Sequence, residues 1–405
     1  MTPDRRVSVA SIPAEGAPAS LSTPMTLLLA AACGLIVANL YYAQPLIGPI
    51  SATLGLSPAA AGLIVTLTQI GYGLGLLFIV PLGDLFENRR LILVITGLGT
   101  LAVIGAGLSQ TPLQFLTAAL FIGIGSVAVQ VIVPFSAHMV AEEHRGATVG
   151  NVMSGLMVGI MLARPASSFI ADFLPWHMVF FLSAGVLVAL MLVIARALPD
   201  RVPQAGLSYG ELLSSMGRLF IATPILRRRA LYQSLLFGAF SVFWTTTPLL
   251  LSGPEFGLSQ GQIALFALAG AAGAVAAPIA GRMADRGWSF WATRAAMASV
   301  AVAFLMTHIA PAGSTLALAL LTVAAILLDF GVTTNLVLGQ RAIFLLGAEY
   351  RSRLNGLYMT IFFSGGAIGS AIGAYLYAGG GWGAASLFGI AFPVAALLYA
   401  FTEKR

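Results

Sequence analysis

The sequence predicts an all-α membrane protein with twelve transmembrane helices in two six-helix bundles. Three observations favour this fold class: 59% of the 405 residues are hydrophobic, only 8% are charged, and long apolar runs recur along the whole chain. An ordinary soluble domain carries about a quarter charged residues, and one membrane helix needs about 20 apolar residues. The composition therefore excludes a soluble protein and fits a chain that crosses the membrane many times.

The chain divides into five segments. Residues 1–24, rich in Ser, Pro and Ala, are expected to form a disordered cytoplasmic tail, and residues 402–405 a second cytoplasmic tail. Between them, residues 25–197 are expected to form the N-terminal bundle, residues 198–228 the cytoplasmic central loop, and residues 229–401 the C-terminal bundle. The central loop is the longest interruption of the apolar runs, which makes it the natural boundary between the halves.

Gly, Pro and charged residues separate the apolar runs and mark the expected helices. In the N-terminal bundle these helices cover 25–49, 59–81, 91–109, 112–140, 147–172 and 176–197. In the C-terminal bundle they cover 229–251, 259–282, 289–309, 315–341, 352–378 and 381–401. Within the central loop, Tyr209 to Ile221 favours an amphipathic surface helix.

The basic residues indicate the orientation of the chain, because cytoplasmic loops of membrane proteins carry an excess of Lys and Arg. With the N-terminus inside, all of the 20 basic residues except Arg164 lie in segments on the inside face. We therefore expect an integral protein of a bacterial inner membrane with both termini in the cytoplasm. The net charge of +6 then follows from topology and does not indicate nucleic-acid binding.

Several classes of function are disfavoured by single residue types. One cysteine, Cys33, cannot form an internal disulfide or a thiolate metal cluster, and the four histidines are too scattered for metal-ligand spacing. The only lysine is Lys404, so a phosphate-binding loop of the type Gly-x-x-x-x-Gly-Lys-Ser/Thr is absent. Since no nucleophile with a nearby base is visible either, we expect no cofactor, no metal and no enzymatic activity.

The two halves of the chain repeat one another. A shift of 206 residues places Gly150 on Gly356, so the loop that enters the fifth expected helix recurs before the eleventh. A shift of 201 places Asp84, after the second expected helix, on Asp285, after the eighth. Transporters commonly bind their solute between such internal repeats, and the repeat therefore favours transport.

The loops after the second and eighth expected helices carry the residues of a family signature. The first reads PLGDLFENRR at 81–90 and the second GRMADRGW at 281–288. They resemble the major facilitator superfamily, whose signature is Gly-x-x-x-Asp-Arg-x-Gly-Arg-Arg, and the resemblance implies the major facilitator fold. Acidic and basic residues of these loops are predicted to form a conformational latch; alternatively, the arginines of the first loop only anchor the inside face. The predicted latch residues are Asp84, Arg89, Arg90, Gly281, Asp285 and Arg286.

The fifth expected helix is similar to the antiporter motif of the same superfamily, Gly-x8-Gly-x3-Gly-Pro-x2-Gly-Gly. Gly150, Gly159 and Ala163 have its spacing, whereas Arg164 replaces the proline. The stretch NLYYAQPL at 39–46 resembles the bacterial branch that exports sugars, nucleosides and drugs. The resemblance implies proton-coupled export.

Asp329 is the only acidic residue deep in an expected span, near the middle of the tenth helix. A charge at that depth is costly and is a functional candidate by default. Because burial favours the neutral form of a carboxyl group, Asp329 is the predicted proton-coupling residue. The alternative is a structural carboxyl group bonded to neighbouring threonines or to the backbone.

Arg164 is the one basic residue away from the inside face, and it is the second predicted proton-coupling residue. At 1.5 Å per residue it lies about 7 Å beyond the middle of the fifth helix, on the outer side. Three roles stay open: pairing with Asp329 across the halves, contact with an anionic group of the solute, or snorkelling toward Asp172 and lipid headgroups. If the pair forms in one state only, protonation of Asp329 releases it.

Uncharged polar and aromatic residues on several expected helices suit a solute cavity. The family resemblance implies that the first, fourth, seventh and tenth helices line it. Rings with a few polar contacts suit a neutral or amphiphilic solute, and the alternative for these residues is ordinary hydrogen bonding between helices. The predicted cavity residues are Asn39, Tyr42, Gln44, Gln69, Gln130, Trp244, Thr245, Thr333 and Asn335.

These observations predict a secondary active transporter that exports a small neutral or amphiphilic solute, such as a drug, sugar or nucleoside, in exchange for protons by alternating access. The expected partners are the solute, protons and the lipid bilayer; nucleic acid is not expected, and the protein is expected to act as a monomer. Two alternatives stay open: proton-coupled uptake by symport, and a non-transporting receptor or sensor on the same fold.

Overall fold

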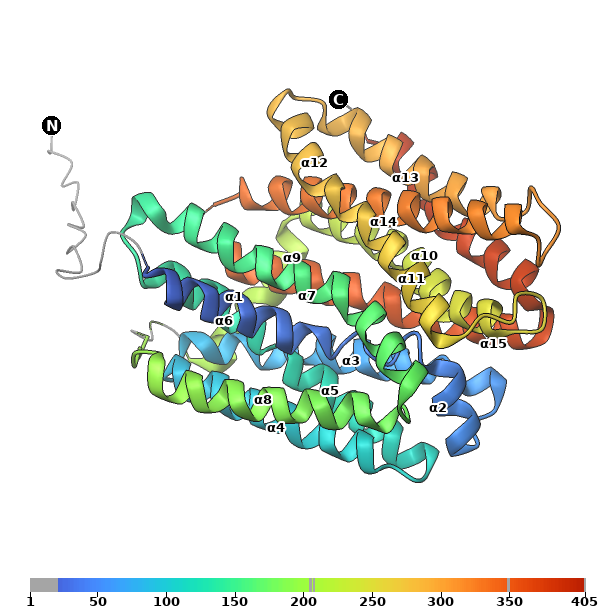
Figure 1. Ribbon diagram of the computed structural model, residues 1–405. Helices are drawn as coiled ribbons and strands as arrows, with labels where there is room; N and C mark the ends of the chain where they lie inside the picture. Colours follow the sequence, from blue (N-terminus) through green and yellow to red (C-terminus); the bar gives the residue numbers. More distant parts are fainter. Residues whose placement is uncertain (1–20, 204–205, 207, 348–349, 404–405) are drawn as a thin grey trace, which may run out of the picture.

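Apolar runs of this length form helices, because a backbone that crosses a bilayer must satisfy its hydrogen bonds within itself. The computed structural model describes residues 21–203, 206, 208–347 and 350–403, and all regular structure within these ranges is helical. The helices form two bundles, the N-terminal half in blue to green and the C-terminal half in yellow to red (Figure 1). The predicted all-α membrane fold with two bundles is confirmed.

The N-terminal half begins with a helix that is shorter than predicted. The run expected at 25–49 breaks after Ala38 and resumes at Ile47. Pro45, inside the break, has no backbone N–H to donate and restricts the residue before it. The helices of this half are α1 (Thr23–Ala38), α2 (Ile47–Leu54), η1 (Pro58–Ala60), α3 (Leu63–Phe78), η2 (Val80–Asp84), α4 (Asn88–Leu108), α5 (Pro112–Ser126), α6 (Ala128–His138), η3 (Glu142–His144), α7 (Arg145–Phe173) and α8 (His177–Ala197).

The C-terminal half begins earlier than predicted. Its first long helix starts at Pro224 rather than at residue 229, since a proline is well tolerated as the first residue of a helix. The last helix runs through both final expected spans and turns at Gly381, whose φ of 61° favours glycine. The helices from the central loop onward are α9 (Tyr209–Ala222), α10 (Pro224–Ser252), α11 (Gln260–Gly270), η4 (Ala271–Val275), α12 (Ala276–Asp285), α13 (Ser289–Met306), α14 (Thr315–Phe344) and α15 (Arg351–Phe401).

Ten helical segments of the described residues are long and apolar enough to cross a bilayer. Helix α1, with 16 residues, is too short by this measure, and α15, with 51 residues, is long enough for two crossings. The count of twelve therefore stays a prediction. Of the predicted tail at 1–24, residues 1–20 lie outside the described residues. Of the predicted tail at 402–405, residues 404 and 405 do.

In each half, the backbones of the first helix and of a later helix approach very closely. A Cβ atom on Gly159 of α7 would lie 2.2 Å from the carbonyl oxygen of Gly34 on α1. A Cβ atom on Gly369 of α15 would lie 2.2 Å from the carbonyl oxygen of Gly238 on α10. Only glycine permits such contacts. Close backbone packing of this kind thus occurs in both halves, although the shift of 206 residues places Gly159 on Gly365, one helical turn before Gly369.

The largest contacts between the two halves lie along two helix pairs. Helix α3 contacts α15, and α7 contacts α11, which lies beside it at the centre of Figure 1. Helix α9 joins the halves at one end: the Tyr209 hydroxyl donates to the Phe78 carbonyl at 2.8 Å, and Arg353 Nη1 donates to Ser215 Oγ at 2.9 Å. The helix predicted within the central loop is therefore present and contacts both halves.

Candidate functional site

A cavity of about 350 Å³ lies between the two halves. Helices α6 and α7 supply most of its wall on the N-terminal side, and α10, α14 and α15 on the C-terminal side. It extends from Arg164 and Asp329, in the helix interiors, to Val149 and Phe344, near the start of α7 and the end of α14. We call this end of the molecule, which carries Arg145, the basic end.

Arg164 lies at the end of the cavity that is farther from the basic end, and only 3% of it is exposed. Its Nε donates to Gln44 Oε1 at 2.8 Å. Its guanidinium carbon lies 4.3 Å from the ring centroid of Trp244, 4.9 Å from that of Phe240 and 5.1 Å from that of Tyr41. Nη2 is buried and has no hydrogen-bond partner among the described residues. Three aromatic rings therefore hold a cation whose outer end is unpaired.

Asp329 lines the same cavity from α14. The indole Nε1 of Trp244 donates to Asp329 Oδ1 at 2.9 Å. None of the ion pairs within the described ranges joins Arg164 to Asp329. Trp244 contacts both charged groups: Arg164 lies over its ring and Asp329 accepts from its N–H. A direct pair between the two charges in another state remains a prediction.

Beyond Arg164 the two halves meet. Ser168 Oγ of α7 donates to Gln260 Oε1 of α11 at 3.1 Å. On the next turn, a Cβ atom on Gly261 would lie 2.5 Å from Asp172 Oδ2, so the two helices are in close contact there. The cavity therefore extends toward the basic end, and helix contacts close it at the opposite end.

Two of the predicted cavity residues line the cavity, and a third contacts Arg164 on its wall. Gln130 and Thr333 are both part of the lining. Gln130 Nε2 donates to the hydroxyl of Tyr72 at 2.9 Å, which ties α6 to α3. Gln44 orients Arg164 through the bond to Nε. These side chains place polar groups on both sides of the cavity, near the charged pair.

Other predicted cavity residues make contacts between helices. Gln69 Nε2 donates to Ser241 Oγ at 3.0 Å, from one half of the molecule to the other. Asn335 Nδ2 donates to Gln233 Oε1 at 2.6 Å within the C-terminal half. Thr245 is fully buried, and its hydroxyl has no partner within the described part of the chain. A role of these residues in solute binding remains a prediction.

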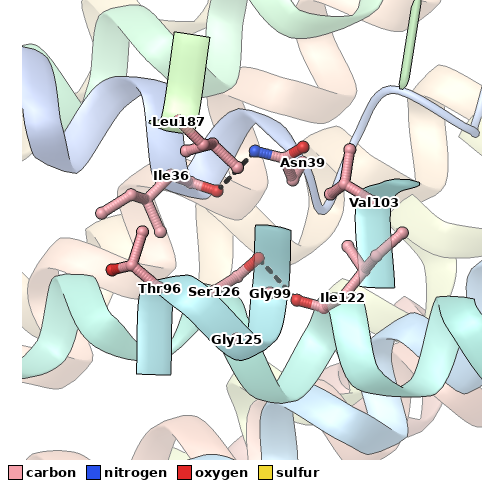
Figure 2. A pocket seen from close by; sticks show the side chains of 9 residues that line it. All are labelled: Ile36, Asn39, Thr96, Gly99, Val103, Ile122, Gly125, Ser126 and Leu187. Carbon is pink, nitrogen blue, oxygen red and sulfur yellow. Dashed lines mark hydrogen bonds between the residues drawn. The ribbon is translucent and has the colours of Figure 1, made fainter. Parts of the chain in front are cut away.

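Asn39 lines a different and much smaller space. A void of about 10 Å³, the size of one water molecule, lies between α1, α4, α5 and α8 (Figure 2). Asn39 Nδ2 donates to the Ile36 carbonyl at 3.3 Å, and its Oδ1 accepts from Ser183 Oγ at 2.7 Å. Tyr42, which is also predicted on the first expected helix, is not among the residues that line the central cavity.

Much of the cavity wall consists of apolar residues that sequence analysis does not single out. Met153, Met157 and Met161 line it from α7, and Phe237 and Phe240 line it from α10. The methionines recur every four residues, which places them on one helix face, and this spacing is the signal that could have identified them. Flexible thioether side chains and rings suit a solute with an apolar body.

The first predicted latch has a different partner from the one expected. Arg89 pairs with Asp200, and Arg90 lies 3.9 Å from Glu87. Arg201 of the central loop donates through its side chain to Asn88 and through its backbone N–H to Glu87 Oε1 at 3.3 Å. Burial raises the pKa of Glu87, but hydrogen bonds from the backbone N–H groups at 90, 89 and 201 outweigh it and hold the pKa below its usual range.

No ion pair within the described ranges involves Asp84, and Arg201 and Arg353 are the cations that act on it electrostatically. In the second copy, Asp285 pairs with Arg341 Nη1 at 2.6 Å, both within the C-terminal half. The same Arg341 atom lies 3.5 Å from the Gly281 carbonyl, and Arg286 lies over the Trp288 ring. The action of either loop as a latch remains a prediction.

Comparison with known proteins agrees with this architecture. Residues 27–343 match the family model described as Major Facilitator Superfamily. The chain is 40% identical over 379 residues to the uncharacterized transporter YgaY of Escherichia coli O157:H7, covering 93% of this chain and 95% of YgaY. It is 31% identical over 371 residues to the probable transporter SCO4007 of Streptomyces coelicolor, covering 91% and 84%. A crystal structure of a mutant of the nucleoside transporter NupG has a similar fold, with a TM-score of 0.77, 13% identity and coverage of 93% and 99%.

Proposed function

We propose, since the chain belongs to the major facilitator superfamily of membrane transporters, that it exports a small amphiphilic solute in exchange for protons. Asp329 is the site that carries the proton, and the cavity between the halves is the site that carries the solute. The observation that supports this function is the position of Asp329: a carboxyl group on the cavity wall that accepts from Trp244 and takes part in no ion pair of the described residues.

A carboxyl group of this kind changes its charge without breaking a structural ion pair. Its only hydrogen bond among the described residues comes from Trp244, a donor that serves the ionised form. When the cavity faces the opposite side of the membrane, a proton entering from there neutralises Asp329 and weakens any bond from the solute to it. Exchange follows because proton and solute compete for the same group.

Alternating access requires the halves to meet at each end in turn. In the present conformation the contact between Ser168 and Gln260 closes the end opposite the basic end. We propose that this contact breaks while the basic end closes around Val149 and Phe344, which now lie at the cavity's other limit. The cavity is complete within one chain, which supports a monomer. The distribution of basic residues supports a position in the bacterial inner membrane with both termini in the cytoplasm.

The test uses proteoliposomes that contain pyranine, a pH-sensitive dye, and a panel of nucleosides, sugars, amphiphilic drugs and amino acids. In the unmodified protein, solute efflux should be accompanied by proton movement in the opposite direction. Asp329→Asn should still allow downhill solute exchange, at a higher half-saturating concentration because the solute loses one contact, but should lose solute-dependent proton flux and accumulation driven by a pH gradient. Glu255→Gln, which removes an exposed carboxyl group at the opposite end, is the matched control and should transport like the unmodified protein.

Full accumulation by Asp329→Asn under an imposed pH gradient would contradict the assignment of the proton site. Movement of solute in the same direction as the protons would instead show symport and would contradict exchange. The absence of flux for every member of the panel, in a sample whose folding is verified by thermal unfolding, would contradict transport of these solute classes.

A further inference from the structure

We propose that the solute is a small zwitterion with an apolar side chain, such as an apolar α-amino acid or its dipeptide, whose carboxylate binds Arg164 and whose ammonium group binds Asp329. This inference rests on the proposed function and names its substrate class. It stands on three observations: an unpaired cation, an unpaired carboxylate and an apolar wall, all in one cavity.

Arg164 has the geometry of a carboxylate receptor. Its Nε donates to Gln44, and its buried Nη2 has no acceptor within the described part of the chain. A buried guanidinium with a free donor is costly, and a planar carboxylate fits the pair of terminal nitrogens. The rings of Tyr41, Phe240 and Trp244 fix the guanidinium plane, so the free end is already oriented for its ligand.

Asp329 offers the opposite charge on the same cavity wall. Trp244 donates to Oδ1, and no hydrogen bond among the described residues uses Oδ2. The carboxylate therefore keeps acceptor capacity for an ammonium group. Tyr72 and Gln130, which bond to each other on the facing side, are uncharged and cannot neutralise it.

The two charges are not in direct contact. Arg164 and Asp329 form no ion pair within 4.0 Å, although both contact Trp244. A solute with one charge would satisfy one of them and leave the other, whereas a zwitterion satisfies both at no net charge. The remaining wall is apolar and suits an aliphatic or aromatic side chain; it includes Met153, Met157, Ile160, Leu336 and Phe362.

The test measures equilibrium binding to the purified full chain in lipid nanodiscs at pH 7, where the amino groups of the probes are mostly protonated, by titration calorimetry with no gradient present. The probes are L-phenylalanine, its homodipeptide, and two analogues that each lack one charge: 3-phenylpropionate, without the ammonium group, and phenylalanine amide, without the carboxylate. Glycine serves as the probe without an apolar side chain. At least one zwitterion with a side chain should bind tenfold or more tightly than both singly charged analogues and than glycine.

Two variants then assign each end of the ligand. Arg164→Gln removes the partner of the carboxylate, so the zwitterion should no longer bind more tightly than phenylalanine amide but should still bind more tightly than 3-phenylpropionate. Asp329→Asn removes the partner of the ammonium group, so the zwitterion should lose its advantage over 3-phenylpropionate and keep its advantage over phenylalanine amide. Arg164→Lys and Asp329→Glu retain the charges, so partial recovery in them separates loss of charge from misfolding. The preference of L-phenylalanine over its dipeptide, or the reverse, identifies the length of the zwitterion.

Several results would overturn the proposal. It fails if neither zwitterion binds, if a singly charged analogue binds as tightly, or if both preferences survive in both charge-removing variants. Because binding is measured without a gradient, this outcome is independent of proton coupling. If the protein selects zwitterions but moves no protons, only the proposed proton exchange is refuted. If it moves protons with an uncharged solute and with no zwitterion, only the proposed substrate class is refuted.

Discussion

The close approach of α7 and α1 predicts opposite effects for two glycines of one helix. A Cβ atom on Gly159 would lie 2.2 Å from the Gly34 carbonyl oxygen, whereas a Cβ atom on Gly150 would meet nothing within 4 Å. Gly150 and Gly159 both belong to the motif that resembles the antiporter signature, and both lie inside α7. Both substitutions are Gly→Ala within one helix, so they share the gain in helix propensity. A difference in stability between the two variants therefore reports the packing at Gly159.

The expected sizes follow from these distances. Ordinary contact begins at 3.4 Å, so the new methyl group in Gly159→Ala must move by about 1.2 Å against backbone atoms, which cannot rotate away. Overpacking of this kind costs about 1–3 kcal/mol. Gly150→Ala meets no such contact and gains up to about 1 kcal/mol from the better helix propensity of alanine.

The assay is thermal unfolding of the purified variants in one detergent, followed by intrinsic fluorescence and by the monodisperse fraction in size-exclusion chromatography. Gly159→Ala should unfold at a lower temperature than the unmodified protein, and Gly150→Ala at the same or a higher one. Equal midpoints for the two variants, or an unchanged midpoint for Gly159→Ala, would refute the packing argument. Gly369→Ala, at the equally close contact of α15 with Gly238, should lower the unfolding temperature for the same reason.

Three further outcomes are expected. If one zwitterion leaves for each proton that enters, one charge crosses the membrane per cycle. A potential of 100 mV imposed with valinomycin should then supply about 2.3 kcal/mol, or roughly fiftyfold accumulation of the solute. Solute accumulation that does not change with the potential would contradict this. Glu87 has a pKa below its usual range, so it contributes stability that is present above the ordinary carboxyl range and lost as pH falls through the lowered value; acid unfolding should be less steep in Glu87→Gln. Tags at either terminus should react only from the cytoplasmic side, and labelling from outside would overturn the orientation.

The helical fold could be predicted from the sequence because membrane helices carry a strong and local signal. Apolar runs of sufficient length must be helical in a bilayer, and α8, expected at 176–197, covers His177–Ala197. The interruptions inside runs were harder to predict. The break after Ala38 extends as far as Ile47 and contains Pro45, and the turn between the last two runs depends on the positive φ of Gly381; hydropathy registers neither.

The candidate site was predictable only in part, for a similar reason. Asp329 and Arg164 are conspicuous because charges are rare in apolar runs, and both line the cavity. The role of Trp244 between them depends on the relative rotation of α7, α10 and α14, which no local pattern encodes. Likewise, the contact of Arg201 with Asn88 joins positions 113 residues apart, so the loop motif alone gave no sign of it.

Because the two charges lie on different halves, a solute that binds both of them also connects the halves. Arg164 is fixed to α7, which is bound backbone to backbone to α1, while Asp329 and Trp244 belong to the other half. A zwitterion would thus act as a tether between two rigid bodies, and its length would set how far they can part. A molecule with only one of its charges would occupy the cavity without drawing the halves together, which makes singly charged analogues natural starting points for inhibitors that arrest the cycle.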